Sequence, residues 1–379
     1  MEKPFNRIPR RVLMTADTIG GVWTYALELA RALEPHGIEF TIATMGAWLT
    51  PEQIKEARSL SNVEICESDF KLEWMDSPWR DMARAGEWLL RLAAKRRPDV
   101  IHLNNYAHGA LDWKMPVLVV AHSCVLSWFR AVKGECAPAE WDTYRKAVCR
   151  GIRAADCVVA PSRTMLECAR HLYGPLPKSE VIYNARQPDS FRPGPKKNLV
   201  LTAGRFWDEA KNIAALANVA PELPWPIHVA GETKSPNGTD HAMEHLLPLG
   251  RLSARELAPW FAQASIYALP ALYEPFGLSI LEAALAGCAL VLGDIPSLRE
   301  IWGGAALFVP PRDPVALKTA LRRLMENDGE RKEMAARARS RALEYSPQRM
   351  ADGYLSVYEQ LVACQEGHHQ QEEFAVCES

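Results

Sequence analysis

Short apolar runs alternate with helical segments along most of the chain, and this alternation limits the folds open to it. In the first half, the runs that read as strands are 11–15, 40–43, 100–103, 117–121, 157–160 and 181–183. Between them, segments such as 22–33 and 79–95 carry apolar residues at helical spacing. Apolar strands separated by helices predict parallel sheets that are covered on both faces, the α/β class.

A segment with two prolines, a glycine and a basic pair, 191–198, divides this pattern. After it the strand pattern restarts at 199–202, 227–230, 266–269 and 289–292. We therefore predict two similar α/β domains facing a cleft, an N-terminal one over 1–192 and a C-terminal one over 198–344. A helix over 345–365 is expected to close the fold by packing back toward the N-terminal domain. Residues 366–379 are expected to form a disordered tail.

Composition excludes several classes of protein. The 379 residues are enough for two domains with cores, and a net charge of −2 argues against a nucleic-acid partner. No apolar run approaches the roughly 20 residues that span a bilayer, and residues 1–11 do not resemble a signal peptide. The nine cysteines are scattered without a Cys-x-x-Cys pair, which favours a reducing cytoplasm over a disulfide framework or a structural zinc site.

Two carboxylates, Glu274 and Glu282, are separated by seven residues in an otherwise apolar run. Glu274 precedes a proline, which favours an extended or turn conformation. Glu282 falls in the helix that follows, and a partly buried carboxylate there needs a partner. The N–H groups of Gly277, Leu278 and Ser279 would be free donors at the helix N-terminus, a site suited to anions. The segment therefore predicts a phosphate-bearing ligand between two polar anchors.

Two strand ends of the first domain carry candidate ligand contacts. Gly20 and Gly21 lie at a strand-to-helix turn, where a backbone without side chains can approach a ligand. The alternative is a tight turn with no ligand, and the pattern is not the Gly-x-Gly-x-x-Gly of dinucleotide-binding folds. His122 ends an apolar strand at the same edge, as a catalytic or substrate-contacting residue or as a structural one.

Two cations, Arg205 and Lys211, follow the first strand of the second domain. They could converge on phosphate at the carboxyl edge of the sheet. The alternative is a pair of solvated surface cations, one of them paired with Asp208 or Glu209. No Asp-x-Asp occurs in the chain, so a metal-bound site of that type is unsupported and no metal is expected.

The predicted helix 79–95 carries basic residues on one side and apolar residues on the other. Core packing with a solvated basic face is the favoured interpretation. The cationic face leaves weak peripheral membrane association open.

Together these segments resemble glycosyltransferase family 4, from about Val12 to about Leu361. The run from Glu274 to Glu282 resembles the Glu-x7-Glu signature of the family, and Arg205 with Lys211 resembles its donor-phosphate motif. The resemblance implies the GT-B fold, two Rossmann-like parallel-sheet domains facing an inter-domain cleft. It also implies a retaining transfer from a nucleotide-diphosphate sugar.

The resemblance implies a role for each candidate residue. The residues implied for the donor diphosphate are Arg205, Lys211, Gly20, Gly21, Leu278 and Ser279. Those implied for the transferred sugar are Glu274, Phe276 and Gly277, with Glu274 and His122 at the reaction centre. Glu282 would bind the ribose, and Arg251 with Leu252 would lie by the base. The donor is a co-substrate, and no cofactor is implied.

Three positions depart from the family pattern. Ala185 and Asn212 stand where glycine is usual, which affects loop geometry. The sequence 295–297, Ile-Pro-Ser, replaces the usual glycine pair near the expected sugar pocket. The donor, as a UDP- or GDP-sugar, and the hydroxyl acceptor are therefore open, although 123–141 is the expected acceptor segment.

The interpretation that follows is a cytoplasmic hexosyltransferase acting in glycan, polysaccharide or glycoconjugate synthesis. An acceptor hydroxyl would attack the face that the diphosphate leaves. The alternatives are a sugar-nucleotide epimerase of the same fold, which needs no acceptor, and a non-catalytic subunit that binds sugar nucleotides. A phosphorylase is disfavoured because no lysine context for pyridoxal is evident.

Overall fold

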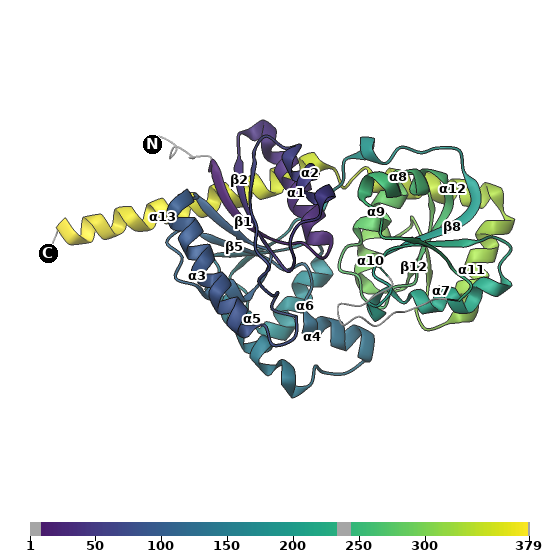
Figure 1. Ribbon diagram of the computed structural model, residues 1–379, viewed down its shortest axis with the longest axis horizontal. Coiled ribbons are helices and arrows are strands. Elements are labelled where there is room, and N and C mark those ends of the chain that lie inside the picture. Colours follow the sequence, from purple (N-terminus) through teal and green to yellow (C-terminus); the bar gives the residue numbers. More distant parts are fainter. Residues whose placement is uncertain (1–8, 233–243, 378–379) are drawn as a thin grey trace. The chain divides into compact units, whose positions relative to one another are not determined.

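The computed structural model describes residues 9–232 and 244–377, which form two compact units (Figure 1). Unit 1 holds the described residues up to Leu126, together with Ala137–Tyr183 and those from Pro347 on. Unit 2 holds Ser127–Cys136 and the described residues of Asn184–Ser346. The chain therefore passes from one unit to the other more than once.

Unit 1 is built on a parallel sheet of seven strands in the order β3-β2-β1-β4-β5-β6-β7. Its strands are β1 (Arg11–Asp17), β2 (Glu39–Met45), β3 (Val63–Cys66), β4 (Val100–Leu103), β5 (Val117–Val120), β6 (Cys157–Ala160) and β7 (Lys178–Val181). Its main helices are α1 (Gly21–Leu33), α2 (Pro51–Arg58), α3 (Trp79–Arg96), α5 (Asp142–Ala154), α6 (Arg163–Tyr173) and α13 (Pro347–Cys377). In register, Val12 of β1 lies between Phe40 and Val100, and the strand order reverses between β1 and β4.

Helix α3 packs its apolar side into unit 1, as the favoured interpretation of its sequence predicted. Its buried residues are Met82, Ala85, Gly86, Leu89 and Ala93. On the solvated side, Arg84 and Arg91 pair with acids one turn away on the same helix. Neighbouring acids therefore offset part of the basic face. In the described part of the chain, no helix has the length and apolar character needed to cross a membrane.

Helix α13 joins unit 1 through a buried chain of hydrogen bonds. The Tyr25 hydroxyl of α1 donates to Tyr354 Oη of α13 at 2.5 Å. The Tyr25 oxygen can then accept from His102 Nε2 of β4 at 3.2 Å, and His102 Nδ1 accepts from the Tyr358 hydroxyl at 2.6 Å. Burial lowers the pKa of His102 to about 3, so the ring is neutral and one nitrogen accepts.

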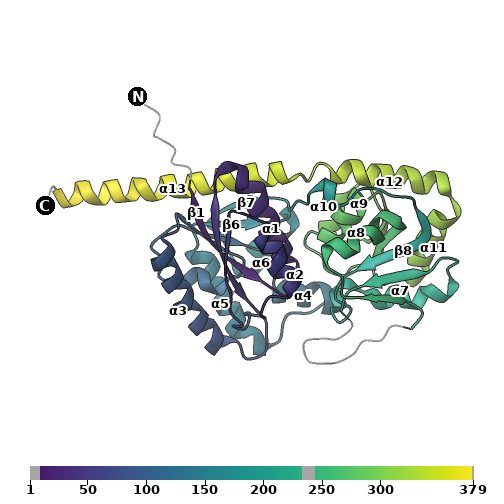
Figure 2. The same ribbon diagram turned by 45° about the horizontal axis from the view of Figure 1, so that its top comes forward.

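Figure 2 shows α13 as one long helix that continues to Cys377. The disordered tail expected from residue 366 is therefore wrong as far as Cys377. The residues after Gly367 include no proline, and glutamine and glutamate are good helix formers that allow the helix to continue.

Unit 2 is built on a parallel sheet of six strands in the order β10-β9-β8-β11-β12-β13. Its strands are β8 (Lys197–Ala203), β9 (Ile227–Ala230), β10 (Leu247–Gly250), β11 (Ala264–Leu269), β12 (Ala289–Gly293) and β13 (Leu307–Val309). Its main helices are α7 (Ile213–Val219), α8 (Ala254–Gln263), α9 (Leu278–Leu285), α10 (Pro296–Trp302), α11 (Pro314–Glu326) and α12 (Asp328–Ala342). The order reverses between β8 and β11, so a switch point lies at the carboxyl ends of these two strands.

The predicted N-terminal boundary at 192 differs from the observed one in two places. Residues from Asn184 on belong to unit 2, because Arg186 pairs with Glu282 and Phe191 packs its ring on Phe261. Ser127–Cys136 also belongs to unit 2, which no composition signal in the sequence indicated. Both differences arise from side-chain partners distant in sequence.

Candidate active site

The loops at the switch point of unit 2 hold most of the predicted site residues. Arg205 and Lys211 follow β8, and Glu274 follows β11, its neighbour in the sheet. The Ala210 carbonyl accepts from the amides of Leu272 and Tyr273, which ties one loop to the other. Parallel α/β sheets bind ligands at such an edge.

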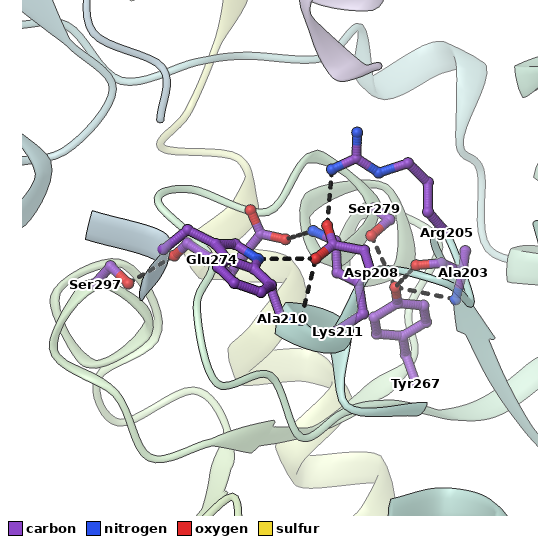
Figure 3. A network of polar contacts seen from close by, with 10 residues as sticks. Ala203, Arg205, Asp208, Ala210, Lys211, Tyr267, Glu274, Ser279 and Ser297 are labelled. Carbon is purple, nitrogen blue, oxygen red and sulfur yellow. Dashed lines mark hydrogen bonds and ion pairs between the residues drawn. The ribbon is translucent and has the colours of Figure 1, made fainter. Parts of the chain in front are cut away.

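Lys211 and Glu274 form an ion pair, with Nζ 2.5 Å from Oε2 (Figure 3). Both side chains are largely buried, with 18% and 11% of their surface exposed. Ser297 Oγ donates to the Glu274 carbonyl at 2.6 Å and fixes the backbone of this loop. The pair brings a cation and a carboxylate together at the carboxyl edge of the sheet.

Arg205 pairs with Asp208, Nη2 lying 2.8 Å from Oδ2, and stacks on the Trp207 ring. Burial raises the pKa of Asp208, but the charges of Arg205 and Lys211 outweigh it, so the pKa lies below the usual range. The pairing with Asp208, one part of the surface-cation alternative, is observed, but Lys211 is largely buried and pairs with Glu274 instead of lying in solvent. The ionised Asp208 carboxylate thus holds the Arg205 guanidinium in place.

Helix α9 begins at this edge with Gly277 as its N-cap. Gly277 has φ +90°, a backbone conformation that favours glycine, and a Cβ there would lie 2.6 Å from Ile280 Cδ1, the end of a side chain that would have to shift. The first amides of the helix, Leu278 and Ser279, have no partner within it. Phe276 is buried edge-on against Tyr345, so its side chain is a core residue and only its backbone can face a ligand.

Ser279 at the helix start is hydrogen-bonded to a buried tyrosine. The Tyr267 hydroxyl of β11 lies 2.8 Å from Ser279 Oγ and also bonds the Ala203 carbonyl at 3.2 Å. Tyr267 thereby links the end of β8 to the first turn of α9 (Figure 3).

Glu282, one turn further along α9, pairs with Arg186 at 2.8 Å, and both side chains are nearly buried. The Arg186 guanidinium also lies 5.0 Å above the Phe191 ring. The partner that a buried carboxylate requires is therefore an arginine supplied from the chain before β8.

Arg251 and Leu252 follow β10, at the outer edge of the same sheet. Arg251 is exposed and pairs with Glu232 at 2.8 Å. Leu252 is half-buried, just before the Ser253 N-cap of α8. Neither residue contacts Lys211 or Glu274 through a hydrogen bond or ion pair recorded among the described residues.

Gly20, Gly21 and His122 lie in unit 1. Gly20 is the N-cap of α1, which begins at Gly21 after the end of β1. His122 follows β5, and its ring packs edge-on against the Tyr25 ring, with the two ring centroids 4.5 Å apart. All three residues therefore lie near carboxyl ends of strands in their own sheet.

His122 is held in one tautomer by Asn104. The Asn104 amide nitrogen donates to the Thr15 carbonyl at 2.6 Å, so its Oδ1 accepts from His122 Nε2 at 2.8 Å. Burial lowers the pKa of His122 to about 3. The ring is neutral at physiological pH, with Nδ1 as its acceptor.

Several partners in these networks were not singled out from the sequence. Arg186, Tyr267 and Asn104 hold Glu282, Ser279 and His122 respectively. Ser297, which holds the Glu274 loop, was noted only as part of the departure at 295–297. The sequence indicated that a buried Glu282 needs a partner, but it did not indicate that Arg186 is that partner. Within 9–232 and 244–377, no group of three or more His, Cys, Asp or Glu is arranged to hold a metal ion.

Comparison with known families matches both halves of the chain. The model described as Glycosyltransferase Family 4 matches residues 19–189, and that described as Glycosyl transferases group 1 matches 197–327. The chain belongs to this family of glycosyltransferases, which are transferase enzymes, and its two parallel-sheet units are the GT-B fold.

Relatives agree with this assignment, and solved structures share the fold. A glycogen synthase of Mycobacterium tuberculosis is 28% identical over 76% of this chain and 75% of its own length. A D-inositol 3-phosphate glycosyltransferase of Xylanimonas cellulosilytica is 26% identical over 94% and 98%. Sucrose-phosphate synthase from Thermosynechococcus elongatus superposes with a TM-score of 0.79 at 18% identity, covering 94% of this chain and all of that one. HepE of Anabaena, in complex with UDP and glucose, gives 0.74 at 13%, covering 93% and 100%.

Proposed function

We propose that the protein transfers a sugar, with retention, from an α-linked nucleotide-diphosphate sugar to a hydroxyl acceptor. The donor is a UDP- or GDP-sugar, and the product is a glycan, polysaccharide or glycoconjugate. The observation that carries the proposal is the placement of Arg205, Lys211, Glu274 and the α9 N-terminus at one switch point. The HepE structure with UDP and glucose, of the same fold, supports a sugar-nucleotide donor.

In the proposed reaction, Arg205, Lys211 and the first amides of α9 bind the diphosphate and stabilise its charge as it leaves. Glu274 faces the sugar and stabilises the positive character that develops there. The acceptor hydroxyl attacks the face that the diphosphate vacates, and a departing phosphate oxygen takes its proton. When the donor is bound, Lys211 gives up part of its ion pair with Glu274 and contacts the phosphate.

Glu282 binds the ribose in this proposal, and Arg251 with Leu252 lie toward the base. From unit 1, Gly20 and Gly21 offer backbone to the diphosphate. The neutral ring of His122 accepts a hydrogen bond from the sugar through Nδ1, the nitrogen that Asn104 does not occupy.

We propose that the reaction takes place in the cytoplasm, since Cys157 and Cys288 are buried thiols that form no disulfide. Weak peripheral association with a membrane through α3 is part of the same proposal. The protein's own cations meet the diphosphate charge, so activity is expected to survive chelation of divalent metal.

The test begins with thermal-shift screening of nucleotides and sugar nucleotides, where UDP or GDP is expected to stabilise the protein. Glu274→Ala and Lys211→Ala are then expected to lower transfer from the identified donor by about 100-fold or more. Lys114→Ala, in an exposed pair with Asp112, is the matched control and should transfer normally. Near-wild-type rates in both site variants would overturn the assignment.

Product formed from donor without acceptor would identify an epimerase. Binding of donor without hydrolysis or transfer, across a panel of acceptors, would identify a binding subunit.

A further inference from the structure

The segment Ser127–Cys136 lies with unit 2, although unit 1 residues flank it in sequence on both sides. It contains the last residues of α4 (Val125–Trp128) and a five-residue π-helix, Phe129–Lys133, which ends at Gly134 with φ +73°. π-Helical turns are rare and occur frequently at functional sites.

This segment contacts the residues around the candidate phosphate site. Trp128 Nε1 donates to Asp208 Oδ1 at 3.1 Å, and Lys133 Nζ lies 2.7 and 2.8 Å from the Glu209 carboxylate oxygens. Ser127 Oγ is 2.7 Å from the Tyr273 hydroxyl. The contacts therefore reach the loop between Arg205 and Lys211 and the residue before Glu274.

Asp208 connects Trp128 to the cation of the site. Its Oδ1 accepts from Trp128 Nε1 and from the Ala210 amide at 3.1 Å, while Oδ2 accepts from Arg205 Nη2 at 2.8 Å. Two donors on one oxygen fix the plane of a buried carboxylate, and that plane directs the guanidinium. Figure 3 shows Asp208 between Ala210 and Arg205.

We propose that Trp128 is a positioning residue for the diphosphate, acting through Asp208 on Arg205. This inference rests on the proposed function and deepens it, because it assigns control of the phosphate contact to a segment only five residues after His122 in sequence. Without the indole N–H, Asp208 Oδ1 accepts only from the Ala210 amide. The Asp208 carboxylate is then less firmly oriented, and the Arg205 guanidinium that it holds loses its fixed direction.

The test compares wild type with Trp128→Phe, which keeps an aromatic ring and removes the N–H. Affinities for UDP and UMP, or for GDP and GMP if guanine is the base, are measured by calorimetry. Diphosphate binding is expected to weaken about fivefold, consistent with the net contribution of one hydrogen bond, with monophosphate binding changed less than twofold. A destabilised fold alone would not change the ratio of the diphosphate affinity to the monophosphate affinity.

Trp113→Phe is the matched control, since its indole N–H donates to the His108 carbonyl in unit 1 at 2.8 Å and should leave the ratio unchanged. In an Asp208→Asn background, Trp128→Phe is expected to have no further effect. An unchanged ratio in Trp128→Phe, or additive effects with Asp208→Asn, overturns the inference.

If Trp128→Phe does not fold, Asp208→Asn alone must lower the same ratio, and an unchanged ratio overturns the inference. Failure of the wild-type protein to bind any nucleoside diphosphate overturns the proposed function instead.

Discussion

The ion pair of Arg186 and Glu282 is nearly buried on both sides, so the two charges depend on each other. Arg186→Met should lower the free energy of unfolding by about 3 kcal/mol, because Glu282 is left as an uncompensated buried carboxylate. Denaturant unfolding measures the change.

Arg192→Met is the control for that prediction, since Arg192 pairs with Asp189 in solvent and is 75% exposed. Its effect should stay within about 0.5 kcal/mol. Equal unfolding midpoints for the two variants would contradict a stabilising role for the buried pair.

Gly277 and Gly250 separate two reasons for requiring glycine. Both have positive φ, but a Cβ at Gly250 would meet nothing within 4 Å, whereas one at Gly277 would lie 2.6 Å from Ile280 Cδ1. Gly250→Ala should cost about 1 kcal/mol of unfolding free energy from backbone strain, and Gly277→Ala clearly more. Comparison of their melting temperatures checks this, and equal losses would show that the contact with Ile280 relaxes.

The predictability of individual site residues followed their chemistry. The apolar surroundings of Glu282 predicted that its carboxylate needs a partner. Nothing in the sequence indicated that Arg186 is that partner, because the contact joins segments about 100 residues apart. Tyr267 was hidden because a tyrosine inside an apolar strand reads as a core residue. The roles of the site residues remain predictions for the experiments above.

At the scale of elements, α13 is secured by polar groups inside an apolar interface. Tyr358→Phe removes the donor to His102 Nδ1 and leaves a buried acceptor without its bond. We expect a loss of about 1–3 kcal/mol in the free energy of unfolding of unit 1. Denaturant unfolding followed by tryptophan fluorescence measures it, and a stability equal to that of wild type would show that the acceptor finds another partner.

Central strands were easier to predict than edge strands. The predicted strands at 100–103, 157–160 and 227–230 match the observed bounds of β4, β6 and β9. The strands that were missed, β3, β10 and β13, all lie at sheet edges, and the edge strand β7 was placed about three residues late. An edge strand pairs on one side only, so its residues need not form the continuous apolar run that marks a buried parallel strand.

At the scale of the whole molecule, buried ionisable groups make stability depend on pH. Burial lowers the pKa of His102 from 6.5 to about 3 and that of His108 from 6.5 to about 4. Below pH 6.5 the unfolded chain therefore binds protons at these rings that the folded chain does not bind. On acidification below pH 6.5, each of these histidines therefore lowers the free energy of unfolding by up to about 1.4 kcal/mol per pH unit.

Glu73 acts in the opposite direction. Burial raises its pKa from 4.5 to about 7, so the folded state holds a proton that the unfolded state lacks between those values, and acidification across that range adds stability. Glu73→Gln should therefore lose stability more steeply than wild type between pH 7 and pH 5, as measured by denaturant midpoints. Parallel profiles would contradict the raised pKa.

The return of α13 to unit 1 also sets the order in which the chain can finish folding during synthesis. A ribosome releases the N-terminal half first, yet the core around Tyr25 and His102 is incomplete until Tyr354 and Tyr358 have been made. Every residue of unit 2 is made before that point. The half of the protein that is translated first is thus the half that folds to completion last, and a nascent chain halted before Pro347 would expose its apolar surface to chaperones and proteases.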